Sequence, residues 1–311
     1  MIKYLFFVLR IVLGIIFLYS GYSKLFNTLP LEMSLTDTGL FNWGIAPFVS
    51  RFFVGLEFLL GFMLILGFRI KKITTPLAIG LLSVFSLYLI YLLIKNNSNV
   101  DCNCFGDKIL MTASQALVKN IVMILMLGCF LKFSTAFELD FDKNSNFYYL
   151  FISAMIIYSP FISNKMDANF ANFDKNKTNY TPPLHLLNPS NDTAISKINY
   201  KSGKQILAFL SISCKHCNYT AKKLGIMKRQ NPNLPISLII NGDKKELNTF
   251  IEKNNVRNLS FQFFKGKETL IQIAGPNAPV IMLLNNGVVE FKPSYKELSD
   301  KNLTDWFNKE N

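Results

Sequence analysis

The sequence predicts a membrane-spanning bundle of four or five helices followed by a water-soluble α/β domain. The 311 residues are 50% hydrophobic and 17% charged, with a mean hydropathy of +0.26, whereas an ordinary soluble domain carries about 25% charged residues. The charge is also uneven, because residues 1–164 hold only 12 of the 33 Lys and Arg and 8 of the 20 Asp and Glu. The first half is therefore apolar enough for a bilayer and the second half is charged like a soluble domain, which excludes a disordered chain.

The helical half contains five apolar windows. A spanning helix needs about 20 mostly apolar residues, and the windows that approach this length are residues 4–23, 48–68, 73–94, 115–133 and 147–163. The fifth window is short and ends near Pro160. The first follows Met1 closely and has no small-residue cleavage site, so we expect it to remain as an uncleaved anchor.

Positive charge predicts the orientation of these spans. Arg69, Lys71 and Lys72 lie between the second and third windows, and short loops rich in Lys and Arg face the cytoplasm. With five spans, everything after residue 164 lies outside the cytoplasm, and with four it would lie inside. We expect five spans, and therefore a multi-pass protein of the bacterial inner membrane whose soluble domain faces the periplasm.

Three charged residues fall within the apolar windows, namely Arg10, Arg51 and Glu57. Each costs about 2.5–3.5 kcal/mol at the bilayer centre unless it is paired or reaches the surface. At about 1.5 Å of rise per residue, Arg10 and Glu57 differ in depth by about 7 Å, which an arginine side chain can span. We expect a buried Arg10–Glu57 pair, either functional or only a packing clamp. Lys24 and Lys119 are expected to extend to the outer surface.

Four of the five cysteines form two close pairs, CNC at 102–104 and CKHC at 214–217. A disulfide between Cys102 and Cys104 would close a very small ring, whose strain makes it easy to reduce. This favours an exchange site, with a zinc or copper(I) site or no chemistry as the alternatives. Cys129 lies in the fourth span and is expected to be a small core residue.

The CKHC motif has a context typical of redox chemistry. Residues 204–212 predict a buried strand, and residues 218–230 predict an amphipathic helix. Cys214 would then lie at the helix N-terminus, where backbone N–H groups stabilise a thiolate. His216 would add to this when protonated, and Cys217, one turn later, could resolve a mixed disulfide. A lone Cys-x-x-Cys is a weak zinc signal, because structural zinc takes four ligands.

The remaining segments alternate as an α/β domain requires. Strands are predicted at residues 235–241, 259–264, 278–284 and 288–291, and helices at 244–255 and 294–309. Asn286-Gly287 provides a two-residue hairpin turn. We therefore divide the chain into a membrane domain (1–164), an extended mobile linker rich in Asn, Lys and Pro (165–190) and an α/β domain (191–311). His185, in the linker, is expected at the surface.

This order of elements resembles the thioredoxin fold. The resemblance implies that Pro279, at the start of the hairpin, is cis and packs against the motif near Cys214. Two positions depart from the family: the Trp that is common before the first cysteine is Ser213, and the buried acid of many members is Ala208. Proton transfer at Cys217 would then need another base or water. The Cys-x-His-Cys pattern resembles the periplasmic thiol oxidases more than the cytosolic reductases.

The first half resembles the MauE family, within the broader DoxX-like group. The residues that carry the resemblance are Arg10, Gly14, Phe17, Gly21 and Lys24, then Gly55, Glu57 and Gly61, and finally CNCFG at 102–106. Proteins of this family are implicated in making disulfides in a secreted dehydrogenase subunit, together with a separate thioredoxin-like protein, MauD. The resemblance implies that both modules are joined here in one chain, and it does not by itself imply methylamine metabolism.

These observations together predict a membrane-anchored thiol–disulfide oxidoreductase. Electrons would pass between Cys214/Cys217 and Cys102/Cys104, in support of disulfide formation or reduction in exported client proteins. By analogy with other membrane thiol oxidases, a membrane quinone is the candidate acceptor. A metal-handling protein and a non-enzymatic membrane scaffold are the alternatives. The net charge of +13 is scattered, without a block of like charges, so we expect the lipid bilayer as a partner and no nucleic acid.

Overall fold

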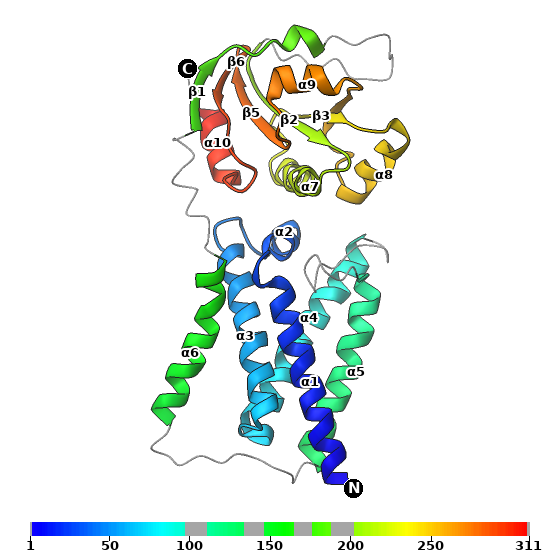
Figure 1. The fold of residues 1–311 in the computed structure, drawn as a ribbon, viewed down its shortest axis with the longest axis vertical. Coiled ribbons are helices and arrows are strands. Elements are labelled where there is room, and N and C mark those ends of the chain that lie inside the picture. The colour runs from blue at the N-terminus through cyan, green and yellow to red at the C-terminus, as the bar shows by residue number, and fades with distance from the viewer. Residues whose placement is uncertain (1, 97–110, 134–145, 165–175, 188–201, 310–311) are drawn as a thin grey trace. The chain divides into compact units, whose positions relative to one another are not determined.

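The computed structural model describes residues 2–96, 111–133, 146–164, 176–187 and 202–309. They form two compact units, Met1–Lys165 and Met166–Asn311, which are drawn in Figure 1. The first unit is entirely helical and the second is a mixed α/β domain built on one sheet. The predicted fold class is therefore confirmed.

The helical unit is a multi-pass membrane bundle. Its elements are α1 (Ile2–Leu25), α2 (Leu29–Asp37), α3 (Ala46–Leu66), the π-helical turn η1 (Ile70–Thr74), α4 (Thr75–Asn96), α5 (Ala113–Phe133) and α6 (Asn146–Ser163). Four described segments are long and apolar enough to cross a membrane: Tyr4–Leu25, Ala46–Leu66, Ile70–Ile94 and Ala113–Leu131. The apolar part of α6, Tyr149–Ser163, is shorter. The 18 residues of α6 extend about 27 Å, against a hydrocarbon core of about 30 Å.

Close contact between glycines sets the register of α1 against α3. A Cβ atom added at Gly14 would lie 2.9 Å from the carbonyl oxygen of Gly61, and one added at Gly61 would lie 2.9 Å from the carbonyl oxygen of Gly14. The two backbones therefore touch at this level. Around this contact, α1, α3, α4 and α5 share one apolar core, which includes Leu13, Leu60, Leu81 and Leu127.

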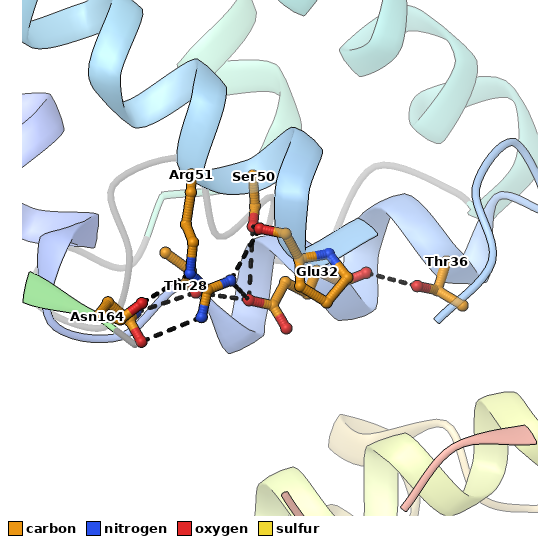
Figure 2. Close-up of polar contacts among 7 residues, drawn as sticks. Thr28, Glu32, Thr36, Ser50, Arg51 and Asn164 are labelled. Carbon is orange, nitrogen blue, oxygen red and sulfur yellow. Dashed lines mark hydrogen bonds and ion pairs between the residues drawn. The ribbon is translucent and has the colours of Figure 1, made fainter. Parts of the chain in front are cut away.

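Polar contacts fix which end of the bundle each helix reaches. The Arg51 Nε atom, near the start of α3, donates to the backbone oxygen of Asn164 at 2.8 Å, just after α6. Asn164 Nδ2 in turn donates to Thr28 Oγ1, just before α2, at 3.0 Å (Figure 2). The Tyr91 hydroxyl of α4 donates to the carbonyl oxygen of Thr38 at 3.4 Å. The C-terminal ends of α4 and α6 therefore lie at the α2 end of the bundle.

One cysteine of the bundle lies where the sequence analysis did not expect it. Cys129 is exposed on the surface of the helical unit, so its prediction as a core residue is wrong. The core-facing stripe of α5 is formed by Met123, Leu127 and Phe130. Cys129 falls outside this helical stripe, and apolar neighbours in sequence do not distinguish a core-facing from a lipid-facing position.

The α/β unit is built on a six-stranded sheet in the order β1-β6-β5-β2-β3-β4. Its strands are β1 (Lys177–Tyr180), β2 (Lys204–Ser211), β3 (Ile236–Asn241), β4 (Ser260–Phe263), β5 (Val280–Asn285) and β6 (Val288–Phe291). Strands β2, β3 and β4 are parallel neighbours, and β5, β6 and β1 follow on the other side of β2 as antiparallel neighbours. The central strand β2 is therefore buried between β3 and β5, and it leads directly into the CKHC motif.

Helices cover both faces of this sheet. They are α7 (Lys215–Gln230), α8 (Lys244–Asn254), α9 (Lys267–Ala274) and α10 (Asp300–Asn308), with a 3-10 turn, η5, at Leu184–Leu187. Leu207 and Phe209 of β2 pack with residues of η5 and α9 in one core cluster. Figure 1 shows α7 and α10 on the opposite face from α9.

Part of the predicted linker belongs to the α/β unit. Residues 177–180 form β1, which pairs antiparallel with β6, and the Leu184 and Leu187 side chains of η5 are buried in the sheet core. The composition of residues 165–190 obscured this short amphipathic segment, whose two leucines recur at i and i+3. His185, between them, is exposed as expected.

The last helix is shorter than predicted. The sequence analysis expected residues 294–309, but α10 begins at Asp300, with Ser299 as its cap. The Ser299 hydroxyl oxygen accepts a hydrogen bond from the Asn302 backbone N–H at 3.0 Å. A side-chain oxygen that satisfies a free N–H group is a strong helix start. The residues before Ser299 form a separate turn, which reaches the CKHC motif.

Candidate functional site

The CKHC motif lies at the start of α7, directly after β2. Cys214 is the N-cap residue of the helix, and its Sγ atom accepts a hydrogen bond from the Cys217 backbone N–H at 3.3 Å. Cys214 is partly exposed, whereas Cys217 is 0% exposed. An external sulfur atom can therefore reach Cys214 and cannot reach Cys217. This difference in access fits an attacking first cysteine and a resolving second one.

The local sequence explains why Cys214 occupies this position. Residues 206–210 of β2 are fully buried between neighbouring strands, so the chain must turn when it leaves the sheet at Ser211. Cys214 takes extended backbone angles, φ −85° and ψ 121°, before the helix begins. Its sulfur thus faces the free N–H groups and the positive end of the α7 dipole, which stabilise a thiolate.

Cys217 is held as a neutral thiol. Burial raises the pKa of the Cys217 thiol well above its usual value, and the hydrogen bond with Cys214 raises it further. Ala208, which stands at the acid position of many thioredoxins, is fully buried in β2. Cys217 would therefore have to lose its proton before it could attack a sulfur atom.

Pro279 completes the site from the next strand. The Ala278–Pro279 peptide bond is cis, as the thioredoxin resemblance implies. The bond directly precedes β5, where Val280 pairs with Phe209 of β2. The Cys214 thiol donates to the carbonyl oxygen of Ala278 at 3.7 Å. The predicted proximity of Pro279 and Cys214 is therefore present.

Tyr295 and Asn254 lie beside the motif and were not predicted from the sequence. His216 is exposed, and its Nδ1 atom lies 3.0 Å from the hydroxyl oxygen of Tyr295. Asn218 Nδ2 donates to the carbonyl oxygen of Cys214 at 3.0 Å, and Asn218 Oδ1 accepts from Asn254 of α8 at 2.8 Å. Tyr295 and Asn254 are far from the motif in sequence, so no spacing pattern could have indicated them.

Cys102 and Cys104 fall in 97–110, outside the residues that the structure describes. Within the described ranges, no three His, Cys, Asp or Glu side chains gather as a metal site would require. The helix that precedes the pair ends at Asn96 and the helix that follows it begins at Ala113.

The bundle contains a buried ion pair that differs from the predicted one. Glu57 pairs with Lys24 at 2.7 Å rather than with Arg10, and these two side chains are 7% and 3% exposed. Ser20, one turn before Lys24, donates its hydroxyl to Glu57 Oε1 at 3.1 Å. Lys24 therefore does not extend to the outer surface as expected, because it neutralises a buried carboxylate.

The register between α1 and α3 explains this correction. Gly14 lies opposite Gly61 in antiparallel helices, so Arg10 lies opposite a position about eight residues beyond Glu57, or about 12 Å along the axis. The estimate of depth from the sequence did not include the relative position of α1 and α3 along their axes. The Arg10 guanidinium instead lies over the Phe7 ring of its own helix, 5.1 Å from the ring centroid.

A small cavity adjoins the Lys24–Glu57 pair. It measures about 30 Å³, and its polar lining consists of Ser20, Glu57, Lys119 and Asn120. This volume has room for about one or two water molecules.

A second buried ion pair stands at the α2 end of the bundle. Arg51 Nη1 lies 2.8 Å from Glu32 Oε1 of α2. Thr28 and Ser50 also donate to this carboxylate oxygen, and the Arg51 guanidinium reaches Asn164 after α6. Figure 2 shows these side chains converging from α2, α3 and the end of α6. The arrangement joins three helices and satisfies both buried charges.

Known proteins resemble the two units separately and together. Residues 2–133 match the family model of methylamine utilisation protein MauE, which confirms the resemblance of the first half. The protein TlpB of Flavobacterium psychrophilum is 27% identical over 76% of this chain and 76% of its own length. This relative therefore extends across most of the chain.

Two solved structures align with the α/β unit. A secreted disulfide oxidoreductase of Mycobacterium tuberculosis, described as homologous to DsbE of E. coli, is 17% identical with a TM-score of 0.30. The alignment covers 41% of this chain and 92% of that one. The thioredoxin domain of a thiol-disulfide oxidoreductase from Bacteroides vulgatus is 16% identical with a TM-score of 0.30, over 35% of this chain and 82% of that one.

Proposed function

We propose that this chain is a membrane-anchored thiol–disulfide oxidoreductase that passes electrons between its CKHC site and the CNC pair of its membrane unit. It thereby supports disulfide formation or reduction in exported client proteins. The observation that carries the proposal is the asymmetry of the CKHC site. Cys214 is accessible at a helix N-terminus beside the Ala278 carbonyl, and Cys217 is fully buried behind it.

The exchange proceeds in two balanced steps. The Cys214 thiolate attacks one sulfur of a partner disulfide, so that the partner S–S bond breaks, a mixed disulfide forms and the released partner thiolate takes up a proton. Cys217 then gives up its proton and attacks the Cys214 sulfur, which releases the second partner thiolate. Two electrons have moved from the Cys214/Cys217 dithiol to the partner, and the reverse sequence oxidises the partner.

The path of the chain through the bundle supports a shared compartment for both cysteine pairs. The C-terminal ends of α4 and α6 lie at the α2 end, so the CNC segment begins where the connection to the α/β unit also begins. Arg69, Lys71 and Lys72 lie between α3 and α4, at the opposite end. With these cations in the cytoplasm, the α2 end faces the periplasm of a bacterial inner membrane.

The fusion of the two units supplies a kinetic advantage. A tether converts the meeting of two sites into an intramolecular event, with effective concentrations that reach the millimolar range for short flexible linkers. The tethered Cys214 then meets the CNC pair more often than a cysteine of a separate thioredoxin-like protein would.

A membrane quinone as the terminal acceptor remains a prediction. No step of the proposed exchange is routed through a quinone. The exchange between the two cysteine pairs and a client is balanced without it, because each disulfide reduced is matched by one dithiol oxidised.

Trapping with Cys217→Ser tests the proposal in the full-length chain in membranes. Without the resolving thiol, a mixed disulfide through Cys214 should accumulate, and mass spectrometry of the cross-linked peptides identifies the partner. The matched control is the double variant Cys214→Ser/Cys217→Ser, which should trap nothing.

The identity of the partner separates the parts of the proposal. Linkage to Cys102 or Cys104 supports the internal relay and a shared side of the membrane. Linkage only to exported proteins keeps the oxidoreductase activity but removes the membrane pair from its path. Absence of any mixed disulfide under oxidising conditions contradicts the proposal and leaves a scaffold or metal-handling role.

A further inference from the structure

The imidazole of His216 is held by a residue from another part of the α/β unit. His216 Nδ1 lies 3.0 Å from the hydroxyl oxygen of Tyr295, and the two ring centroids are 5.8 Å apart. His216 is exposed, so burial does not force this contact. The side chain at the second internal position of CKHC therefore has a defined orientation at the protein surface.

Tyr295 is itself anchored to the helix that carries His216. Its carbonyl oxygen accepts a hydrogen bond from Lys223 Nζ at 2.9 Å, and Lys223 is only 3% exposed. Lys223 follows His216 by seven residues, which is two helical turns on the same face of α7. The turn that contains Tyr295 is also closed by Glu297, whose Oε2 accepts from the Ser294 N–H at 2.8 Å. Lys223 of α7 thus anchors the turn that contains Tyr295, and the Tyr295 hydroxyl holds the His216 ring.

The phenol hydroxyl can bind the imidazole ring in either charge state. A tyrosine hydroxyl can both donate and accept. It donates to Nδ1 when the imidazole is neutral, and it accepts from Nδ1–H when the ring is an imidazolium. The contact therefore holds the ring in both charge states.

We propose that Tyr295 is a positioning residue that acts through His216 on the redox equilibrium of the CKHC site. The held ring stays at the N-terminus of α7, where an imidazolium would stabilise a Cys214 thiolate in the reduced form. The disulfide form has no thiolate to stabilise, so the contact favours reduction of the pair and makes it a stronger oxidant. This inference rests on the proposed function, because it presumes a reversible Cys214/Cys217 disulfide.

Equilibration with glutathione tests the inference in the full-length chain in membranes. One Cys214–Cys217 disulfide and two glutathione thiols give one dithiol and one glutathione disulfide, with two electrons transferred. After acid quenching and thiol alkylation, mass spectrometry of the peptide that contains both cysteines gives the reduced fraction. For Tyr295→Phe we expect the equilibrium constant for reduction to fall about threefold, because the released ring stabilises the Cys214 thiolate less, and this is about 14 mV for a two-electron couple.

Matched variants separate positioning from a general structural effect. Phenylalanine keeps the ring, and the Lys223 contact is to backbone, so the turn remains anchored in Tyr295→Phe. Tyr219→Phe removes another phenol hydroxyl whose ring lies 6.4 Å from His216 between centroids, and it should leave the equilibrium unchanged. Lys223→Met releases the turn from α7 and should shift the equilibrium in the same direction as Tyr295→Phe.

The decisive comparison is made in the His216→Ala background. There, Tyr295→Phe should have no further effect, because the residue through which it acts is gone. An unchanged equilibrium in Tyr295→Phe, or the same threefold change in both backgrounds, overturns the inference and leaves the proposed function standing. A wild-type chain whose Cys214 and Cys217 form no disulfide at any glutathione ratio contradicts the proposed function, and the inference falls with it.

Discussion

The CKHC site and the buried ion pairs of the bundle are two polar assemblies built in opposite ways. At the CKHC site, the donor to the Cys214 sulfur is the backbone N–H group three residues later. In the bundle, Lys24 and Glu57 are 33 residues apart, and Glu32 and Arg51 are 19 apart on different helices. This donor is available wherever a strand turns into a helix at these residues. The second assembly exists only when the helices pack in one register.

Because of this difference, we expect substitutions at the CKHC site to affect reactivity and substitutions in the buried ion pairs to affect stability. Cys214 draws its environment from a helix terminus and is partly exposed, so its removal takes away chemistry and little packing. Glu57 is 5% exposed and neutralises a lysine that is 3% exposed. Removing one partner of such a pair leaves an uncompensated charge inside the bundle, and the cost falls on the fold.

The largest expected effect is the loss of exchange activity at the CKHC site. Cys214→Ser should abolish thiol–disulfide exchange at CKHC, because the oxygen cannot form the mixed disulfide. The free energy of unfolding should change by less than about 0.5 kcal/mol, as for other partly exposed positions. Reduction of a protein disulfide by the pre-reduced full-length chain measures the first quantity, and denaturant unfolding in detergent measures the second. Retained exchange through Cys217 alone would break the assignment of roles.

Removal of one partner of the Lys24–Glu57 ion pair should have the next largest effect, which is a loss of stability. Glu57→Gln leaves Lys24 buried without its counter-charge, and we expect about 3–5 kcal/mol of destabilisation. Replacing both partners, as in Lys24→Met/Glu57→Leu, should recover most of this loss. Thermal and denaturant unfolding of the chain in detergent micelles measures both changes.

Arg10 provides the control for the identity of the pair. In a double-mutant cycle, Glu57→Gln should be non-additive with Lys24→Met and additive with Arg10→Met, because contacting residues couple and distant ones do not. Coupling of Glu57 to Arg10 instead would restore the pair expected from the sequence and contradict the observed register.

Packing of α6 on α3 gives an intermediate effect. A Cβ atom at Gly55 would lie 2.5 Å from the carbonyl oxygen of Ile157 in α6. Gly55→Ala should therefore destabilise the bundle by about 1–3 kcal/mol through overpacking. Gly80→Ala in α4 is the matched control, since no atom lies within 4 Å of its added Cβ, and alanine is the better helix former there. Equal stability of both variants would show that α6 does not pack tightly on α3.

The same contrast explains how much of the molecule could be predicted. The strand and the helix on either side of CKHC follow from a short apolar run and an amphipathic spacing, and the place of Cys214 at the helix start follows from that order. The pairing of Glu57 with Lys24 depends on where Gly14 meets Gly61. No property of a single helix fixes that register, so an argument from depth alone selected Arg10.

Short segments were missed for a related reason. Lys177–Tyr180 and Leu184–Leu187 are too short for a clear period and acquire their structure only from β6 and the sheet core. Tyr295 likewise has no signal in sequence, because its importance comes from the fold bringing it to His216. The sequence thus predicts contacts between residues that are close along the chain, and it does not predict partners that packing brings together.

The smallest expected effect concerns the charge of the buried cysteine. Burial raises the pKa of the Cys217 thiol in the folded chain, whereas an unfolded chain has a thiol pKa of about 8.5. Below about pH 8.5 the thiol is neutral in both states, so its contribution to folding is fully present. Above that pH the unfolded state loses the proton and the folded state keeps it, so stability falls by at most about 1.4 kcal/mol per pH unit.

Comparison with Cys217→Ala isolates this contribution from every other titrating group. Between pH 8 and 9.5, the reduced wild-type α/β unit in the full-length chain should lose about 1 kcal/mol more than the variant, measured by denaturant unfolding. Glu57→Gln, in contrast, should lower the stability of the helical unit without altering this pH-dependent difference, because Glu57 and Cys217 lie in different compact units. Parallel pH profiles for wild type and Cys217→Ala would mean that the folded thiol ionises as freely as an unfolded one, and the resolving role would then need no prior lowering of the Cys217 pKa.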